Sequence, residues 1–201
     1  MRAYISRFMS AVMAGICISI GCIVFLRVGG IAGAVLFTFG LLAVVHYGYA
    51  LYTGTAGFIS SWRDFADLLM IVFIGNFIGC ALTALAALAS YDDIRELAQK
   101  VVEQRTTVSY LGVTFRAVFC GFLMTTAVKF GREGRWLPLL FAVPLFILAG
   151  FYHSIADAFY LLAAGIFTTQ TICNYVLMVV GNFLGCNLYR IVISKDSKKE
   201  A

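Results

Sequence analysis

Charged residues are scarce in this chain of 201 residues, where Asp, Glu, Lys and Arg together make up 12%. A soluble domain usually has about twice that share, and about half of its residues are apolar, compared with 62% here. The mean hydropathy of +0.93 agrees with this bias. The composition excludes a soluble globular enzyme as the main interpretation. It also excludes a disordered chain, because too much apolar surface would remain in water.

Proline is equally rare, and two prolines in the whole chain are typical of long helices. The six cysteines lie in apolar runs without a C-x-x-C pair, so we interpret them as small buried hydrophobic residues. Neither a metal-ligand cluster nor a phosphate-binding glycine loop is present, so no cofactor and no metal are predicted. The net charge is +5, but the basic residues form no stripe with aromatic residues, and we expect no nucleic-acid partner.

Apolar sequence is abundant, and it is sufficient for six membrane spans of about 20 residues each. The fifth apolar stretch has about 30 residues, too many for one straight helix across a bilayer of about 30 Å, so a helix broken near His153 is predicted. The first stretch is long enough to span and is interpreted as a retained helix, not a signal peptide. We therefore expect an all-α polytopic protein in a lipid bilayer, with one transmembrane domain over 1–201. The predicted spans cover about 7–26, 31–50, 68–89, 109–128, 136–167 and 173–193.

The polar segment 91–107 has apolar residues at helical spacing and is predicted to be an interfacial helix. Orientation follows from the Lys and Arg residues outside the spans. With the N-terminus inside, ten of them fall on the inner side and four on the outer side, and Arg116 lies within the fourth span. Both termini are therefore predicted to be cytoplasmic, and a polar patch at 60–67 is predicted between spans two and three.

An internal repeat divides the chain into halves of about 1–90 and 108–201. The motif around Asn76, Gly-Asn-Phe, recurs around Asn182 with an offset of 106 residues, and Gly15 matches Gly121 at the same offset. Because three spans separate the copies, the halves would enter the membrane with opposite polarity, as in many transporters. The alternative is a common Gly-x-x-x-Gly packing motif used twice.

Two polar positions suggest a pathway through the membrane. His153 follows Gly150 at the predicted break and can titrate within physiological pH, although a packed structural histidine is the alternative. Thr53 lies in Leu51–Thr55, where Gly54 is predicted to unwind the second span into a cavity-lining loop; an ordinary helix end is the alternative. Tyr47 and His153 each lie 29 residues before a repeated asparagine, so the two breaks are predicted to be roughly equivalent.

These motifs together resemble the formate/nitrite transporter family. The matching stretches are Leu51–Gly54, the paired Gly-Asn-Phe motifs and Ala149–Asp157, which occur in the family's order and cover nearly the whole chain. In place of residues common in the family, the chain has Tyr152 before the histidine and Asp157 after it, together with Gly121 and Lys129.

The resemblance implies a homopentamer of aquaporin-like protomers, each with six spans in an inverted three-plus-three arrangement and with spans two and five broken. Each protomer is expected to pass small monovalent anions such as formate, nitrite or hydrosulfide, together with protons, across a bacterial or archaeal cytoplasmic membrane. The flux is expected to depend on pH through a central pore histidine, and the protein is not expected to be an enzyme. The pore and substrate residues that the resemblance implies are His153, Thr53, Asn76, Asn182, Phe37, Leu41, Phe146, Tyr52, Arg105 and Asp157.

Among these residues, Phe37 and Leu41 are expected at one constriction and Phe146 at a second, on either side of His153. Arg105 is expected near the outer entrance. Asp157 lies one helical turn after His153, and it is expected either to cap the restarted half-helix or to act as a charge partner of the histidine. Two other function classes stay open. One is a water or small-neutral-solute pore, and the other is a membrane-embedded enzyme that uses His153.

Overall fold

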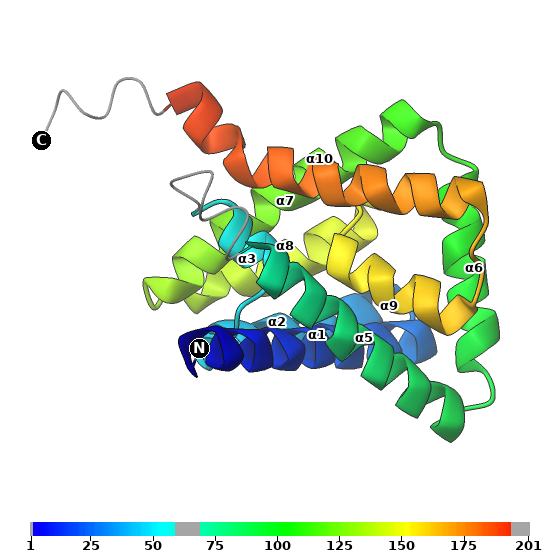
Figure 1. The fold of residues 1–201 in the computed structure, drawn as a ribbon. Coiled ribbons are helices and arrows are strands. Elements are labelled where there is room, and N and C mark those ends of the chain that lie inside the picture. Colours follow the sequence, from blue (N-terminus) through cyan, green and yellow to red (C-terminus); the bar gives the residue numbers. More distant parts are fainter. Residues whose placement is uncertain (1, 59–68, 194–201) are drawn as a thin grey trace, which may run out of the picture.

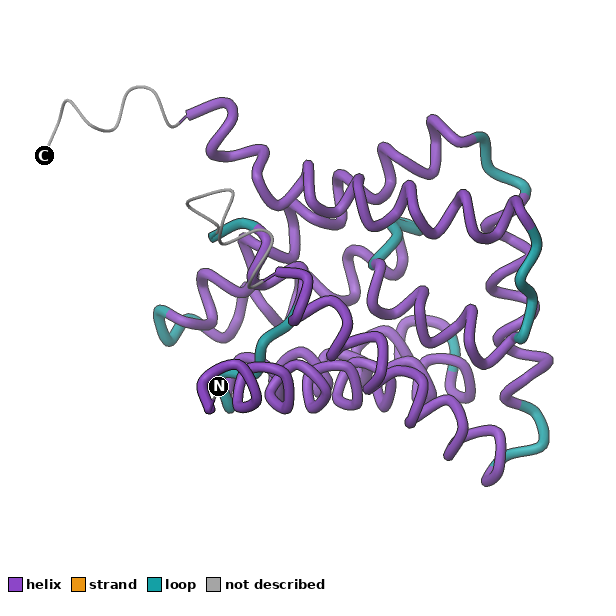
Figure 2. Tube along the Cα trace, viewed as in Figure 1, coloured by secondary structure: helices purple, strands orange, loops and turns teal. Residues whose placement is uncertain are grey.

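The computed structural model describes residues 2–58 and 69–193, and helices joined by short connections account for almost all of them (Figure 1). The tube view contains helices and loops but no strand in this described part (Figure 2). The all-α prediction is confirmed for these residues. The helices are α1 (Arg2–Val28), α2 (Gly30–His46), α3 (Tyr52–Ala56), α5 (Met70–Ser90), α6 (Ile94–Thr106), α7 (Tyr110–Arg132), α8 (Trp136–Leu148), α9 (Ser154–Ala164) and α10 (Thr169–Ile193).

Four of these helices, α1, α5, α7 and α10, are long and apolar enough to cross a membrane. The apolar helices α2, α8 and α9 are shorter. The fifth apolar stretch is divided into α8 and α9 by residues 149–153, as its length predicts. The second stretch is divided into α2 and α3 by residues 47–51. The polar patch predicted at 60–67 lies outside the described residues.

The first break lies earlier in the sequence than predicted, because Gly48 and not Gly54 ends the helix. Gly48 has a φ of 67°, a left-handed conformation that glycine adopts without strain. The amide of Tyr49 donates to the carbonyl of Val44 at 2.8 Å, and that of Gly48 donates to Val45 at 3.2 Å. This is the Schellman pattern that terminates many helices. The predicted unwound loop at Leu51–Thr55 is therefore wrong, because Tyr52–Ala56 is helical.

The second break repeats this geometry residue for residue. Gly150 has a φ of 69°, the amide of Phe151 donates to Phe146 at 2.9 Å, and that of Gly150 donates to Ile147 at 3.1 Å. Equivalent residues of the two breaks are thus 102 positions apart, whereas the glycine and asparagine motifs are 106 apart. The counterpart of His153 is Leu51, four residues after Tyr47, so the two breaks lie in roughly equivalent regions of the two halves, as the 29-residue spacing predicts.

Close contacts between long helices form the frame around these breaks. α1 packs against α5, and α7 packs against α10 in the same manner. A Cβ atom on Gly15 would overlap the carbonyl oxygen of Asn76, and one on Gly121 would overlap that of Asn182. Because both crossings require a residue without a side chain at the same place, the equivalence of Gly15 and Gly121 is also seen in the packing.

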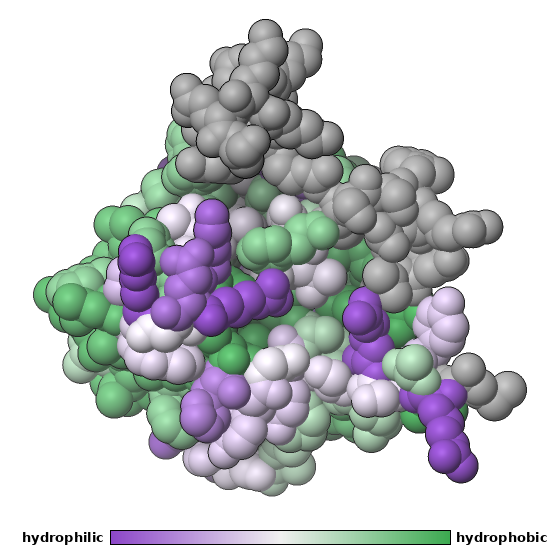
Figure 3. All heavy atoms as spheres, turned by 90° about the vertical axis from the view of Figure 1, so that its left-hand side faces the viewer, coloured by the Kyte–Doolittle hydropathy of each residue, from purple (hydrophilic) through white to green (hydrophobic). Residues whose placement is uncertain are grey.

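The polar segment between the halves forms α6, which runs across one end of the helical body (Figure 1). Its apolar side buries Ile94, Ala98 and Val102, and it packs against α9, α1 and α10. A helix is therefore present within the segment 91–107, for which an interfacial helix was predicted. The opposite end carries the start of α1 and the turn between α7 and α8, and hydrophilic side chains gather on that face (Figure 3).

Candidate functional site

His153 lies at the second break, where its imidazole connects the two halves of the molecule. Its Nδ1 atom accepts a hydrogen bond from the amide of Ala156 at 3.2 Å, so the histidine caps the amino end of α9. Its Nε2 atom lies 3.0 Å from Oγ1 of Thr53 in α3. Because Nδ1 accepts, the proton of the neutral ring is on Nε2 and is donated to the threonine. The His153 and Thr53 side chains are both buried.

The repeated asparagines hold both breaks through equivalent hydrogen bonds. The Nδ2 atom of Asn76 donates to the carbonyls of Ala11 and Ala50, and its Oδ1 accepts from the amide of Tyr52, all at 2.8 Å. Asn76 therefore satisfies the Ala50 carbonyl and the Tyr52 amide beside the break, and it ties this segment to helix α1.

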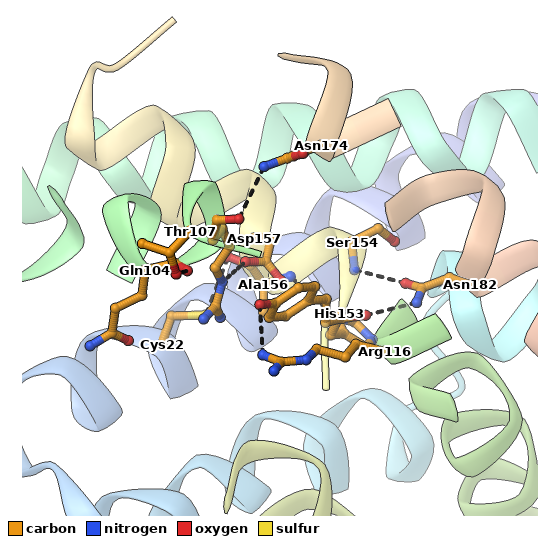
Figure 4. A network of polar contacts seen from close by, with 12 residues as sticks. Cys22, Gln104, Thr107, Arg116, His153, Ser154, Ala156, Asp157, Asn174 and Asn182 are labelled. Carbon is orange, nitrogen blue, oxygen red and sulfur yellow. Dashed lines mark hydrogen bonds and ion pairs between the residues drawn. The ribbon is translucent and has the colours of Figure 1, made fainter. Parts of the chain in front are cut away.

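Asn182 repeats this pattern at the second break. Its Nδ2 donates to Ala117 and Tyr152 at 2.8 Å, and its Oδ1 accepts from Ser154 at 2.7 Å. Figure 4 shows Asn182 between Ser154 and the backbone beside His153. The side-chain oxygen and nitrogen atoms of both asparagines are thus engaged by the backbone, and the two residues position the breaks.

An apolar collar surrounds the imidazole of His153. Phe146 lies with its ring centroid 5.8 Å from the imidazole and 5.9 Å from the ring of Phe37. The collar leaves no space that would hold a water molecule. It consists of Ile18, Phe37, Leu41, Met124, Val143 and Phe146. The expected division of Phe37, Leu41 and Phe146 between two constrictions is therefore not observed, because these side chains meet in one cluster. Sequence reasoning missed Ile18, Met124 and Val143, whose apolar side chains look like ordinary core.

A cavity of about 610 Å³ opens at the end of the molecule that carries the start of α1. We call it the Arg132 cavity; its lining includes Arg7 of α1, Tyr49 and Thr55 near the first break, and Arg132 of α7. The Nη2 atom of Arg132 donates to the carbonyl of Gly54 in α3 at 3.2 Å. Within the described residues, no ion pair joins either arginine to an acid. Neither arginine is among the pore residues that the family resemblance implies.

A second, much smaller cavity of about 20 Å³ lies beyond His153, beneath α6. We call it the Arg105 cavity; its polar lining includes Arg105, Asp157, Asn174 and Tyr175. The Nε atom of Arg105 lies 2.8 Å from Oδ1 of Asp157, and their side chains are only 20% and 7% exposed. The predicted basic residue is therefore present at this end, but its charge is already paired.

Tyr152, immediately before His153, lies against two guanidinium groups. That of Arg105 is 4.6 Å from the centre of its ring and that of Arg116 is 5.5 Å away, distances at which a cation interacts favourably with an aromatic face. Nη1 of Arg116 also donates to the tyrosine hydroxyl at 3.0 Å. The sequence placed Arg116 within a span, which was the signal that it needed a partner.

The two expected roles of Asp157 are both absent from this geometry. The cap of α9 is His153 itself, and the carboxylate of Asp157 binds Arg105 instead of the imidazole. Helical spacing brings residues 153 and 157 to neighbouring positions, but the cation on α6 takes the carboxylate. Only the tertiary arrangement could show this, because 52 residues separate Arg105 from Asp157.

Tyr52 is fixed at both ends. Its amide donates to Oδ1 of Asn76, and its hydroxyl donates to the carbonyl of Val179 at 3.1 Å.

No group of three or more His, Cys, Asp or Glu side chains is placed to hold a metal ion among the residues described. Two buried thiols contact the backbone of the helices that follow the breaks, since Cys186 lies 3.2 Å from the carbonyl of Thr53 and Cys80 lies 3.3 Å from that of Ile155.

A comparison with protein families supports the reading of this site as part of a transporter. The model of the family described as formate/nitrite transporter matches residues 2–194. The chain belongs to the formate/nitrite transporter family. The resemblance inferred from the sequence motifs is thus confirmed, and the protein is a multi-pass membrane protein.

Two curated relatives come from Bacillus subtilis (strain 168). The uncharacterized transporter YrhG is 30% identical over 175 residues, which cover 76% of this chain and 66% of the relative. The uncharacterized transporter YwcJ is 26% identical over 143 residues, which cover 63% of this chain and 56% of the relative. The chain thus spans slightly less than two thirds of the first relative and a little over half of the second.

Solved structures share the fold at low sequence identity. A pentameric formate channel with formate bound superposes with a TM-score of 0.84 and 19% identity, over 94% of this chain and 95% of that one. An FNT family ion channel superposes with a TM-score of 0.80 and 19% identity, over 92% of this chain and 87% of that one. The predicted fold class is therefore confirmed.

Proposed function

We propose that this chain is a channel or transporter for small monovalent anions of the formate, nitrite or hydrosulfide type. The pathway runs from the Arg132 cavity past Thr53 and His153 to the Arg105 cavity. The observation that carries the proposal is the contact of His153 Nε2 with Thr53 Oγ1 inside a collar that excludes water. Family membership and the solved formate channel with the same fold favour an anion over a neutral solute.

The physical problem for such a protein is the dehydration of the anion. An unpaired charge in an apolar constriction is costly, so the collar blocks a bare anion. His153 offers an N–H at this point, and the Thr53 hydroxyl can turn to donate a second hydrogen bond. A proton added to Nδ1 would displace the amide of Ala156 and place positive charge at the amino end of α9. That arrangement favours passing the proton to a bound anion, which could then cross as a neutral acid.

The remaining parts of the proposal concern assembly and orientation. We place the protein in a bacterial or archaeal cytoplasmic membrane as a homopentamer, with both termini and the Arg132 cavity facing the cytoplasm. The pentameric solved channel and the excess of Lys and Arg near that cavity support this arrangement. The equivalent asparagine bonds support an inverted repeat whose halves are joined by α6.

Flux into liposomes tests the function directly. Purified protein should pass formate, nitrite or hydrosulfide faster than protein-free liposomes do, and it should pass glycerol at the background rate. The collar gives the reason, since it offers one hydrogen-bonding site and no wet channel. Glycerol flux without anion flux would show a neutral-solute pore and contradict the proposal.

Substitution of His153 separates its cap from its chemistry. His153→Asn keeps a side chain that accepts the Ala156 amide, because asparagine is a good N-cap, but it cannot exchange a proton in this pH range. We expect normal assembly and a loss of pH-dependent anion flux. His153→Ala loses the cap as well, at a cost of about 1 kcal/mol in stability. Flux with unchanged pH dependence in His153→Asn would contradict the proton-exchange role.

A further inference from the structure

The Arg105 cavity differs from an open anion site, because a carboxylate of the chain already occupies its cation. Oδ1 of Asp157 lies 2.8 Å from Nε of Arg105, well within the range of a charge-assisted hydrogen bond. The exposed fractions of the two side chains, 20% and 7%, show that little water screens the pair. By contrast, the two other ion pairs of the described residues, Arg27–Asp93 and Lys100–Glu96, are at least 40% exposed.

The guanidinium of Arg105 is held in a fixed orientation by its surroundings. Its Cζ atom lies 4.6 Å from the centre of the Tyr152 ring, and the backbone carbonyl of Arg105 accepts from Nδ2 of Asn174 at 3.1 Å. A guanidinium fixed in this way presents its edge to an oxyanion with two oxygens, and a carboxylate matches that edge. Asp157 supplies the same head group as formate.

The cavity beside this pair has unused hydrogen-bonding groups. Oδ1 of Asn174 and the hydroxyl of Tyr175 are buried without a partner, and both residues line the cavity. Its volume of about 20 Å³ is enough for roughly one water-sized group. Buried polar atoms without partners are uncommon, so these two atoms indicate a site for a small polar ligand.

We propose that Asp157 is a built-in competitor at the Arg105 end of the pathway. Its carboxylate occupies the guanidinium edge that an incoming planar oxyanion would use, and the anion must displace it to bind. This inference rests on the proposed function, and it adds a determinant of anion affinity and selectivity at the Arg105 end of the pathway. A tethered competitor acts at high effective concentration, so it weakens anion binding from this side without closing the Arg132 side.

The experiment compares Asp157→Asn with a control of equal charge change. In right-side-out membrane vesicles, the half-saturating formate concentration of Asp157→Asn should fall about tenfold, because the guanidinium loses its competitor. The maximum flux should stay close to wild type. The control, Asp93→Asn, removes an exposed carboxylate paired with Arg27 near the same helix α6 and should leave half-saturation unchanged.

One further variant and two further conditions test the details. In Arg105→Gln/Asp157→Asn the site is neutral, so the gain should disappear. For Asp157→Asn, the gain should be larger for formate and nitrite than for hydrosulfide, because only the planar oxyanions match the guanidinium edge. In inverted vesicles, where the Arg132 cavity faces the medium, Asp157→Asn should match wild type.

A measurement without transport keeps the test separate from the proposed function. Formate should raise the thermal midpoint of purified Asp157→Asn at about tenfold lower concentration than wild type, because a ligand stabilises the state that it binds. If wild type passes no anion, the proposed function is wrong, and this thermal shift alone decides the competitor role. Equal half-saturation or thermal response in Asp157→Asn and wild type would overturn the inference. A fall in half-saturation that Asp93→Asn shares would also overturn it. Failure of both Asp157→Asn and Asp157→Ser to assemble would assign the pair a structural role and overturn it as well.

Discussion

The two ends of the proposed pathway use arginine in opposite ways. The Arg132 cavity is about 610 Å³ in volume, and neither of its arginines forms an ion pair within the described residues. The Arg105 cavity is about 20 Å³, and its arginine is bound to Asp157. A free arginine in a wide aqueous space attracts anions at long range, whereas a paired arginine in a narrow space offers little net field. The difference teaches that a count of basic residues at each end does not give the charge that an anion meets.

Between these two ends, the asparagine hydrogen bonds are equivalent in the two halves. The first prediction tests whether both halves depend on them equally. Asn76→Ala and Asn182→Ala each remove three side-chain hydrogen bonds to the backbone, which costs about 3 kcal/mol. We expect both variants to lower the thermal midpoint of the purified protein by about 10 °C.

Asn187→Ala is the matched control, because this partly buried side chain donates only to the carbonyls of Ala56 and Phe183. It should cost clearly less. A large loss for one repeated asparagine and none for the other would show that the halves are not equivalent at their centres.

The second prediction concerns the Arg132 cavity. Arg132→Gln should raise the half-saturating anion concentration from the Arg132 side about fivefold, because one charge near an anion in water contributes about 1 kcal/mol. Flux assays in inverted vesicles measure this. Arg132→Lys keeps the charge and should stay near wild type. The effect should shrink at high ionic strength, as expected for a charge in a water-filled space.

If Arg132→Gln were as active as wild type at low ionic strength, the contrast between the two ends would lose its functional meaning. The carbonyl of Gly54 that accepts from Arg132 provides an internal check. Glutamine can keep that hydrogen bond, so a rise in half-saturation would report on charge and not on the position of α3.

The smallest effect is expected for Glu96, which is exposed on α6 near the Arg105 end. A hydrogen bond and the charge of Lys100 lower the pKa of its carboxyl. Any stabilisation from this pair is therefore present above the ordinary pKa of a glutamate and is lost as the pH falls through the lowered value. Glu96→Gln should change neither the thermal midpoint at neutral pH nor the half-saturating formate concentration, because exposed pairs contribute little. A shift like that expected for Asp157→Asn would show that any negative charge at this end has the same effect.

The sequence predicted more of the frame than of the site. The motif around Asn76 and Asn182 and the matched pair Gly15 and Gly121 were sufficient to identify the repeat, because helix crossings this close need glycine at fixed positions. The first break was placed a few residues too late, because Gly54 was taken as the helix breaker. The residue that ends the helix is Gly48, whose left-handed conformation forms the same termination as Gly150 at the second break. His153 was identified because a polar residue in an apolar run next to a glycine is rare.

The sequence by itself determined that this is an all-helical membrane protein, because charge is scarce and apolar runs of about 20 residues match the length of membrane-spanning helices, which satisfy their own backbone groups. It also determined that His153 lies at an interruption of the fifth apolar stretch. Only the tertiary structure decided that the histidine caps its own helix and meets Thr53, that Phe37, Leu41 and Phe146 form one collar, and that Arg105 binds Asp157. The physical reason is that these contacts join helices distant in sequence, or depend on which of several possible partners lies within hydrogen-bonding distance of a buried polar group. Hydropathy and spacing report burial and periodicity, but they do not say which groups meet.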